Sequence, residues 1–217
     1  MNEVLFFVTL LVTFTMVAVA EKYFGKTGLM AWVAFATVAA NIEVAKCVDL
    51  FGLSVTLGNV TYGSVSLATD AINAKFGEKE ARKGIMIGFL ALVSFIVITQ
   101  FGLLFQPNEQ DMVAPAMKEL FTLTPRICIA SITAFVISGT LNARLFQIIS
   151  KHTKRLWLKN NASTMCSQLI DSIIFTVIAF WGMFDAYTIV ELIITTYAIK
   201  IIVAIIDTPF IYYIERK

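Results

Sequence analysis

Long apolar segments alternate with short polar connections along the whole chain. Each apolar segment has roughly the 20 residues that a helix needs to cross the hydrocarbon core of a bilayer. The segments are 4–20, 28–50, 54–72, 84–105, 127–149, 162–183 and 188–206. The pattern predicts an all-α, polytopic membrane helix bundle of about seven (six to seven) transmembrane helices.

The connections between these segments are short, and only 106–125 is longer than a dozen residues. No linker, low-complexity tract or internal repeat divides the chain, so residues 1–217 are expected to form a single transmembrane domain. The third segment contains Gly58 and Gly63. A local break of the helix at either glycine is an alternative to one continuous span.

The composition excludes a soluble domain. Hydrophobic residues make up 58% of the chain and charged residues 15%, with a mean hydropathy of +0.80, whereas soluble domains carry about 25% charged residues. Because no polar stretch is long enough to form its own core, any function must lie in or between the helices. Membrane lipid is therefore an expected partner, and nucleic acid is not.

The cysteines and the histidine bear on whether the chain forms disulfides or binds a metal. The three cysteines, Cys47, Cys128 and Cys166, all lie in apolar segments, and no C-x-x-C spacing occurs. A disulfide framework or cysteine metal site is not indicated. The single histidine, His152, lies in a basic connection, which excludes a centre with several histidines. We expect no cofactor and no metal.

The basic residues indicate the orientation of the bundle. Twelve of the 17 Lys and Arg residues fall in the connections at 21–27, 73–83 and 150–161 and in the C-terminal tail, all on one side of a seven-span topology. The opposite side holds Lys118, with Arg126 at its margin. Cytoplasmic loops carry an excess of Lys and Arg. The N-terminus is therefore expected outside and the C-terminus in the cytoplasm.

The third segment and the loop after it are unusually polar. Asn59, Tyr62, Ser66 and Asp70 follow one another at spacings of three or four residues, which places them on one helical face. Polar groups inside a membrane segment line a cavity, bind a ligand or pair with each other. Contacts between helices are the alternative for this face. Asp70 could bind a cation or pair with a basic residue of the loop, such as Arg82 or Lys83.

A second polar group lies near the outer end of the second segment. Asn41, Glu43, Lys46 and Asp49 occur within nine residues. If this stretch is helical, the spacing of three residues lets Lys46 neutralise both acids on neighbouring turns. The group is either a structural ladder of ion pairs or part of a substrate or proton path.

The sixth and seventh segments carry charges near the middle of the membrane. The sixth has a face that combines Thr164, Gln168, Asp171 and Phe175, with Ser167 and Ser172 beside it. The seventh has a face that combines Tyr197, Lys200 and Asp207. Because an unpaired charge at that depth is costly, we expect Asp171 and Lys200 to meet within the bundle. The pair is either structural or part of a binding cavity.

The fifth segment contributes a milder polar face. It opens with Pro125 and Arg126, and its face carries Ser131, Ser138 and Asn142. Arg144 is expected to extend its side chain toward the cytoplasmic interface.

Five motifs occur in order over nearly the whole chain. They are N-x-x-Y-G-x-x-x-L-A-T-D at 59–70, F-G-E-K-E-A-R-K-G at 76–84, P-R-I-x-x-A-S-x-x-A-F at 125–135, S-T-x-x-S-Q-x-x-D-S-x-x-F at 163–175 and Y-x-x-K at 197–200. In this combination the chain resembles the queuosine precursor transporter family, also called the vitamin uptake transporter family. The chain departs from the family pattern at Leu141-Asn142, where members often carry Leu-Asp, and the loss of that carboxylate bears on selectivity or ion coupling.

The resemblance implies a multi-pass protein of the bacterial inner (plasma) membrane. Such a protein would import 7-deazaguanine precursors of the tRNA nucleoside queuosine, such as preQ0 and preQ1. The candidate substrate-binding residues are Asn41, Glu43, Lys46, Asn59, Tyr62, Ser66, Asp70, Arg126, Ser167, Gln168, Asp171, Tyr197 and Lys200.

These side chains suit such a ligand on physical grounds. A 7-deazaguanine presents adjacent N–H donors that a carboxylate accepts, a carbonyl oxygen that an amide serves, and rings that aromatic side chains cover. Asp171 with Gln168 forms one available set. Asp70 or Glu43, with Asn59 and Tyr62, forms another. Which carboxylate contacts the base stays open.

Three function classes follow. The first is a carrier without an ATPase of its own, since no Walker-type glycine-rich loop occurs. The second is a substrate-binding membrane subunit of a multi-component vitamin importer, docked through small residues such as Ala31, Ala34 and Ala39. The third, an intramembrane enzyme that uses Asp70 and Asp171, is disfavoured because the two acids are expected at different depths. We therefore expect a transporter rather than an enzyme, and leave a homo-oligomer open.

Overall fold

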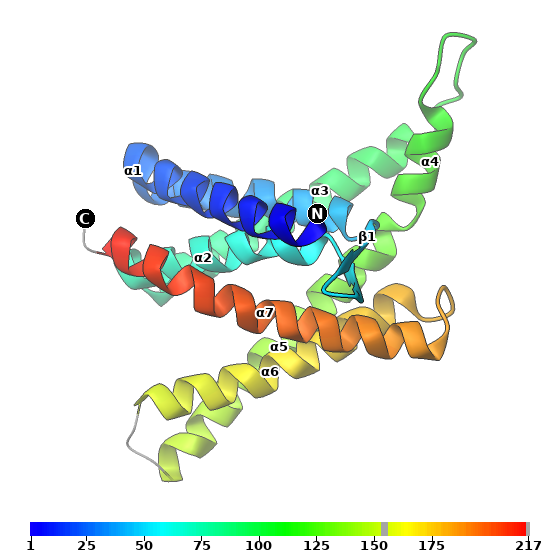
Figure 1. Cartoon of the computed structure of the whole chain (residues 1–217). Coiled ribbons are helices and arrows are strands. Elements are labelled where there is room, and N and C mark those ends of the chain that lie inside the picture. Colours follow the sequence, from blue (N-terminus) through cyan, green and yellow to red (C-terminus); the bar gives the residue numbers. More distant parts are fainter. Residues whose placement is uncertain (153–155, 216–217) are drawn as a thin grey trace.

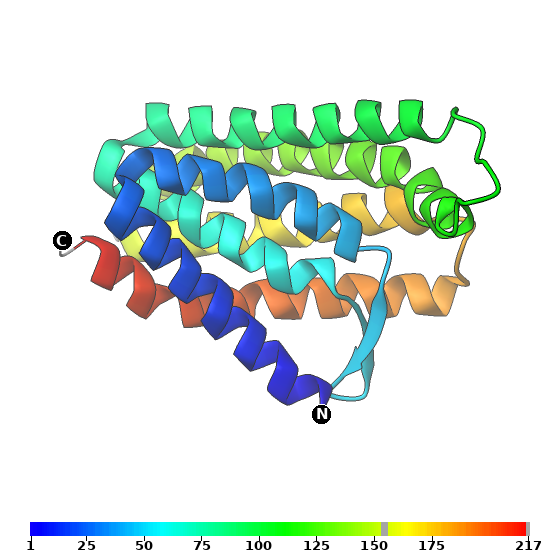
Figure 2. The same cartoon turned by 90° about the horizontal axis from the view of Figure 1, so that it is seen from above.

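The computed structural model describes the backbone of residues 1–152 and 156–215. Side chains are described within these ranges except at 139, 142, 143, 146, 147, 150, 152, 156–164, 204, 207, 208, 211–213 and 215. Helices dominate, and they run side by side in a bundle (Figures 1 and 2). The predicted helical architecture is confirmed, apart from one short hairpin of strands.

The first two predicted segments form two helices, as predicted, which a sharp bend joins into one helical element that folds back on itself. This element, α1 (Asn2–Glu43), bends at Gly25, whose backbone has φ 56° and ψ −137°. Only glycine adopts such angles without strain. The two arms, 2–24 and 26–43, turn back beside each other (Figure 2). At the bend, Gly28 lies against the backbone oxygen of Ala20.

Two short strands follow α1 where the sequence predicted the end of a helix. β1 (Cys47–Leu50) pairs in antiparallel register with β2 (Leu53–Thr56). Phe51 and Gly52 connect them, both with positive φ, as a tight two-residue hairpin turn requires. The prediction that the second helix continues to Leu50 is therefore wrong.

The hairpin is fixed to the bundle from two sides. On α1, the side-chain amide of Asn2 donates to the backbone oxygen of Asp49 at 2.9 Å. On α7 (Ala186–Glu215), Glu191 accepts from the backbone N–H of Ser54 at 2.7 Å. The hydroxyl of Thr195 also donates to the backbone oxygen of Ser54 at 2.8 Å. The hairpin therefore joins the beginning of α1 to α7.

The remaining long helices coincide with the predicted segments. They are α2 (Gly58–Phe76), α3 (Glu78–Gly102), α5 (Thr124–His152), α6 (Leu156–Phe180) and α7. The predicted third segment is interrupted at Gly58, where α2 begins after β2, and α2 then continues through Gly63. The alternative of a break is therefore confirmed at Gly58 and wrong at Gly63. A short helix, α4 (Ala114–Thr122), lies across the ends of the long helices (Figures 1 and 2).

By length and composition, four helical stretches of the described residues could cross a membrane. They are Asn2–Glu43, Glu78–Gly102, Ala114–Ser138 and Ala186–Val203, and Met165–Phe180 is a shorter apolar helix. Many large apolar side chains of these helices, such as Leu11, Leu90 and Ile194, are exposed. This is the surface that a multi-pass membrane protein presents to lipid. The count of seven spans and the orientation stay predictions.

The ends of the bundle differ in charge. The bend of α1, the α2–α3 junction and the end of α7 lie together at one end (Figure 2). There, Lys75 pairs with Glu21 at 2.5 Å, and Glu80 pairs with both Lys26 at 2.9 Å and Lys83 at 2.6 Å. The N-terminus, the hairpin and α4 lie at the opposite end (Figure 2). The basic connections at 21–27 and 73–83 therefore lie at the same end of the bundle.

Two apolar cores hold the bundle together. One is formed mainly by α1, α2 and the second half of α7, with Phe14, Leu29 and Leu67 fully buried. The other joins α5, α6 and the first half of α7 around Ile127 and Leu192. The polar side chains described next lie between these two cores.

Candidate functional site

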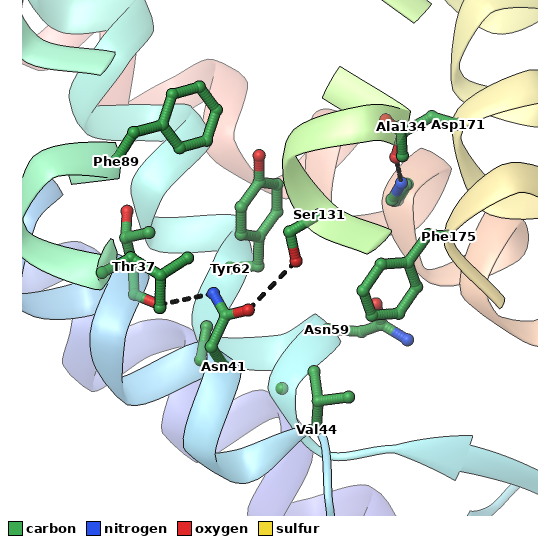
Figure 3. Close-up of a pocket in the computed structure, with 14 residues that line it drawn as sticks. Thr37, Asn41, Val44, Asn59, Tyr62, Phe89, Ser131, Ala134, Asp171 and Phe175 are labelled. Carbon is green, nitrogen blue, oxygen red and sulfur yellow. Dashed lines mark hydrogen bonds and ion pairs between the residues drawn. The ribbon is translucent and has the colours of Figure 1, made fainter. Parts of the chain in front are cut away.

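A cavity lies inside the bundle where six helices approach one another (Figure 3). Its wall is formed by Thr37, Ala40, Asn41, Val44, Gly58, Asn59, Tyr62, Phe89, Leu92, Ser131, Ala134, Asp171, Phe175 and Lys200. The space open to the centre of a water molecule is about 50 Å³. A single water needs about 10–15 Å³ by this measure. The cavity therefore has room for several waters or a small ligand.

The charged centre of the cavity is an ion pair between α6 and α7. The ammonium of Lys200 contacts Oδ2 of Asp171, and the side chains are 15% and 19% exposed. Oδ1 of Asp171 accepts a hydrogen bond from Ser138 of α5 at 3.0 Å. The expectation that Asp171 and Lys200 meet within the bundle is confirmed. Both carboxylate oxygens are engaged, so the charges are compensated although they are removed from bulk water.

A second polar contact joins α1 to α5 across the cavity wall. The side-chain amide of Asn41 donates to the backbone oxygen of Thr37 at 2.8 Å and accepts from the hydroxyl of Ser131 at 3.0 Å (Figure 3). Asn41 is 5% exposed. Because a buried amide without partners is costly, these bonds hold its orientation.

Asn59 links the beginning of α2 to β2 and to α7. Its Nδ2 donates to the hydroxyl oxygens of Thr56 on β2 and Thr196 on α7, each at 2.9 Å. No donor from the described residues reaches its Oδ1. Since Asn59 lines the cavity, that oxygen is available to a ligand donor.

Aromatic rings supply the apolar part of the wall. Tyr62, Phe89 and Phe175 all line the cavity (Figure 3). The ring of Phe89 contacts that of Phe135 edge to face, with centroids 5.0 Å apart. In the described part of the chain, nothing hydrogen-bonds to the Tyr62 hydroxyl. Flat rings beside unused polar atoms suit a planar heteroaromatic ligand.

The predicted ladder of ion pairs near the outer end does not form. Because α1 ends at Glu43, the three charged residues do not share a helix. Glu43 instead accepts a hydrogen bond from Thr61, and Lys46 and Asp49 are exposed. None of these three residues lines the cavity. The hairpin is the reason for this error.

The polar face of α2 is divided between two environments. Asn59 and Tyr62 line the cavity, whereas Ser66 and Asp70 lie further along the helix, outside its wall. Asp70 is exposed and has no ion pair among the described residues. The predicted alternative partners bind elsewhere, since Arg82 pairs with Glu78 and Lys83 with Glu80.

Four more candidates lie outside the cavity wall. Arg126 donates to the backbone oxygens of Ile178 at 2.7 Å and Trp181 at 2.5 Å, at the C-terminal end of α6. A cation there neutralises the unpaired carbonyl groups of a helix end. Ser167 is buried, and Gln168 and Tyr197 are half-buried. The side chains of Asn142, Thr164 and Asp207 lie outside the described part of the chain.

Sequence reasoning missed Thr37, Phe89 and Thr196. Thr37 precedes Asn41 by one helical turn, so its place on the same face was a usable signal. Phe89 is one of 18 phenylalanines, and its sequence position does not separate it from the lipid-facing ones. Thr196 gains its role only through contact with Asn59 on another helix.

Comparison of the sequence with known proteins places the chain among transporters. A family model described as "Putative vitamin uptake transporter" matches residues 56–214. The chain is 41% identical over 209 residues to the "Probable queuosine precursor transporter" of Bacillus subtilis (strain 168), covering 95% of this chain and 91% of the relative. It is 29% identical over 174 residues to the "Queuosine precursor transporter" of Escherichia coli (strain K12), covering 77% and 76%. No solved structure matches the chain significantly.

Proposed function

The chain belongs to the vitamin uptake transporter family, and from this premise we propose that it imports queuosine precursors across the bacterial inner membrane. The observation that carries the proposal is the 41% identity to a relative of that name over 95% of the chain. The expected substrates are 7-deazaguanines such as preQ0 and preQ1, with queuine as a further candidate. Because the named relatives are transporters, the protein is a carrier rather than an enzyme.

The cavity is the proposed binding site. A 7-deazaguanine has adjacent N–H donors on its pyrimidinone ring, and a carboxylate is their best acceptor. Asp171 is the one carboxylate among the described residues of the cavity wall. The Oδ1 atom of Asn59 and the hydroxyl of Tyr62 are available for the remaining polar edges. The rings of Phe89 and Phe175 can cover the faces of the base.

The proposal assigns different tasks to the predicted candidates. Asp171, Lys200, Asn59, Tyr62 and Asn41 line the cavity and would contact the base or hold the wall. Arg126 stabilises the end of α6. Glu43, Lys46, Ser66 and Asp70 would act before or after the cavity, along the substrate path. Ser167, Gln168 and Tyr197 would support the wall from behind.

Transport requires that the cavity open alternately to the two sides. The Asp171–Lys200 pair and the Asn41–Ser131 hydrogen bond both join helices of different cores. Polar contacts of this kind can separate and re-form when the α5–α6 pair shifts against α1 and α7, with the first half of α7 sliding along the second core. We therefore place the moving interface between the α5–α6 pair and the other helices.

Uptake by the purified chain tests this function directly. The protein is reconstituted alone into liposomes, and entry of labelled preQ0 is measured with and without an excess of unlabelled preQ0. Saturable uptake, lost in Asp171→Asn and kept in Lys79→Met, is the expected result. Lys79 is an exposed residue of α3 that lines no part of the cavity. If the purified chain binds preQ0 without transporting it, it is instead the substrate-binding subunit of a multi-component importer.

A further inference from the structure

The net charge of the cavity wall indicates which kind of base the cavity accepts. Among the described residues that form the wall, only Asp171 and Lys200 are charged, and they form an ion pair. The described part of the wall therefore has no net charge. Its other polar groups are the amides of Asn41 and Asn59 and the hydroxyls of Thr37, Tyr62 and Ser131.

The neighbouring carboxylates do not change this balance. Glu43 accepts from the hydroxyl of Thr61, and Glu191 accepts from the backbone N–H of Ser54 at 2.7 Å. Neither lines the cavity, and Asp70 is exposed outside its wall. In the described part of the chain, no spare carboxylate is available to neutralise a cation that enters the site.

Binding of the base must also disturb the ion pair. Oδ1 of Asp171 is held by Ser138 at 3.0 Å, and Oδ2 is held by Lys200. When the N–H donors of a base approach this carboxylate, they compete with the ammonium of Lys200. The displaced ammonium stays beside the ligand, because Lys200 itself lines the cavity. A bound ligand therefore faces a positive charge.

The substituent at position 7 decides how a ligand responds to that charge. The nitrile of preQ0 is neutral and can accept a hydrogen bond from an ammonium. The aminomethyl group of preQ1 is protonated at neutral pH, because aliphatic amines titrate near pH 10, as lysine does at about 10.4. Two like charges in a site removed from water repel strongly, and a buried cation without a partner is costly.

We propose that Lys200 is a specificity determinant that makes the cavity select uncharged 7-deazaguanines over their aminomethyl cations. This inference rests on the proposed function. It adds that the ion pair determines which precursor binds tightly. Replacing Lys200 by a neutral side chain leaves the Asp171 carboxylate without its partner, and that carboxylate would then attract a cationic base.

Competition binding tests the inference on the whole chain in lipid nanodiscs. Labelled preQ0 is displaced by unlabelled preQ0 or preQ1 at pH 7, for the wild type, Lys200→Met, Lys200→Arg and the control Lys79→Met. We expect the wild type to bind preQ0 at least about tenfold more tightly than preQ1, since like charges in a desolvated site are costly. Lys200→Met should remove or reverse this preference. Lys200→Arg keeps the cation and should keep the preference, as should Lys79→Met.

The possible outcomes separate this inference from the proposed function. If the wild type binds both bases equally well, or binds preQ1 more tightly, the inference is wrong and the function stands. The same conclusion follows if Lys200→Met keeps the wild-type preference. If neither base binds the wild type, both the proposed function and the inference fail. If Lys200→Met does not fold, the ratio of the wild-type affinities for preQ0 and preQ1 decides the inference by itself.

Discussion

Asp171 on α6 and Lys200 on α7 lie 29 residues apart in the sequence and form an ion pair inside the bundle. Ser138 on α5 completes the cluster through its hydrogen bond to Asp171. Three helices are thereby joined at the wall of one cavity. The cluster combines a structural role with a position where a substrate would bind.

Breaking this pair from either side should destabilise the protein. Asp171→Asn or Lys200→Met leaves a charge without its partner, for which a loss of about 3 kcal/mol is typical. Thermal unfolding in detergent measures the loss. The double variant Asp171→Asn/Lys200→Met removes both charges and should recover much of the stability, but not the uptake of preQ0. If the double variant is as unstable as the sum of the single ones, the two charges are not coupled.

Asn59→Ala should weaken the junction of α2, β2 and α7. The change removes the donor to Thr56 and Thr196, each bonded at 2.9 Å, and leaves buried hydroxyls behind. We expect a loss of about 1–3 kcal/mol, measured by thermal unfolding, together with a higher KM for uptake. Asn73→Ala is the matched control, because Asn73 is an exposed residue of the same helix. Equal effects of both changes would contradict this role of Asn59.

Gly58→Ala should separate α1 from α2 at the cavity. A Cβ atom at Gly58 would lie 2.3 Å from the backbone oxygen of Ala40 and 2.5 Å from Cγ2 of Val44. Overpacking of this kind costs about 1–3 kcal/mol, and the displaced wall should weaken preQ0 binding. In contrast, Gly102→Ala places its Cβ where no atom lies within 4 Å, so stability and binding should both be kept. Normal stability and binding of Gly58→Ala would show that the helices are not in close contact there.

Arg126→Gln should affect stability rather than substrate recognition. The guanidinium donates to the backbone oxygens of Ile178 and Trp181, and a charged hydrogen bond of this kind contributes about 1.5–3 kcal/mol. We expect a lower melting temperature and an unchanged KM. Arg82→Gln, at an exposed ion pair with Glu78, should change neither. A large rise in KM for Arg126→Gln without loss of stability would place Arg126 in the substrate path.

At acidic pH, Asp185, which precedes α7, should lose its contribution to the stability of the folded protein. Asp185 accepts hydrogen bonds from the hydroxyl and backbone N–H of Thr188 and from the N–H of Tyr187. These bonds hold the pKa of Asp185 below its usual range. Its stabilising effect is therefore present above the pKa of the unfolded chain, about 3.9, and disappears as the pH falls through the lower folded pKa.

The pH dependence can be measured with Asp185→Ala. The variant should melt below the wild type at pH 7, and the difference should shrink as the pH falls toward 3. Glu109→Ala changes an exposed carboxylate that has no hydrogen bond among the described residues, and it should match the wild type throughout. A difference for Asp185→Ala that does not depend on pH would contradict a role for the ionised carboxylate.

Much of the fold could be predicted because hydropathy reports the length of each apolar helix. The hairpin escaped prediction because its residues are as apolar as the helix before it. The local signal was Gly52, which tolerates the positive φ of a tight turn between two short runs that each contain a valine. Phe51, with its positive φ, is not a residue that such a turn favours, so the turn was hidden. The reversal at Gly25 was predicted, because Gly25 lies in the short polar connection between the first two apolar segments.

The site could be predicted in part because membrane-buried charges need partners. Asp171 and Lys200 were each the single charge at the middle of their segments. Because an unpaired charge at that depth is costly in free energy, the sequence predicted that the two would pair. Asn59 and Tyr62 followed from helical spacing. Spacing did not show that the cavity ends before Ser66, because that depends on where α5 and α6 pack. Arg126 looked like a binding residue since sequence does not reveal the helix end that it caps.

Queuosine in cellular tRNA is the measurement that tests the central claim most directly. The chain is expressed in bacteria that can neither make nor import queuosine precursors, and preQ0, preQ1 or queuine is supplied at low concentration. The account predicts that the wild type restores queuosine and that Asp171→Asn, present in the membrane at the same level, does not. Absence of queuosine with all three precursors, despite good expression in the membrane, would contradict the proposed function. Full restoration by Asp171→Asn would instead contradict the assignment of the cavity as the binding site.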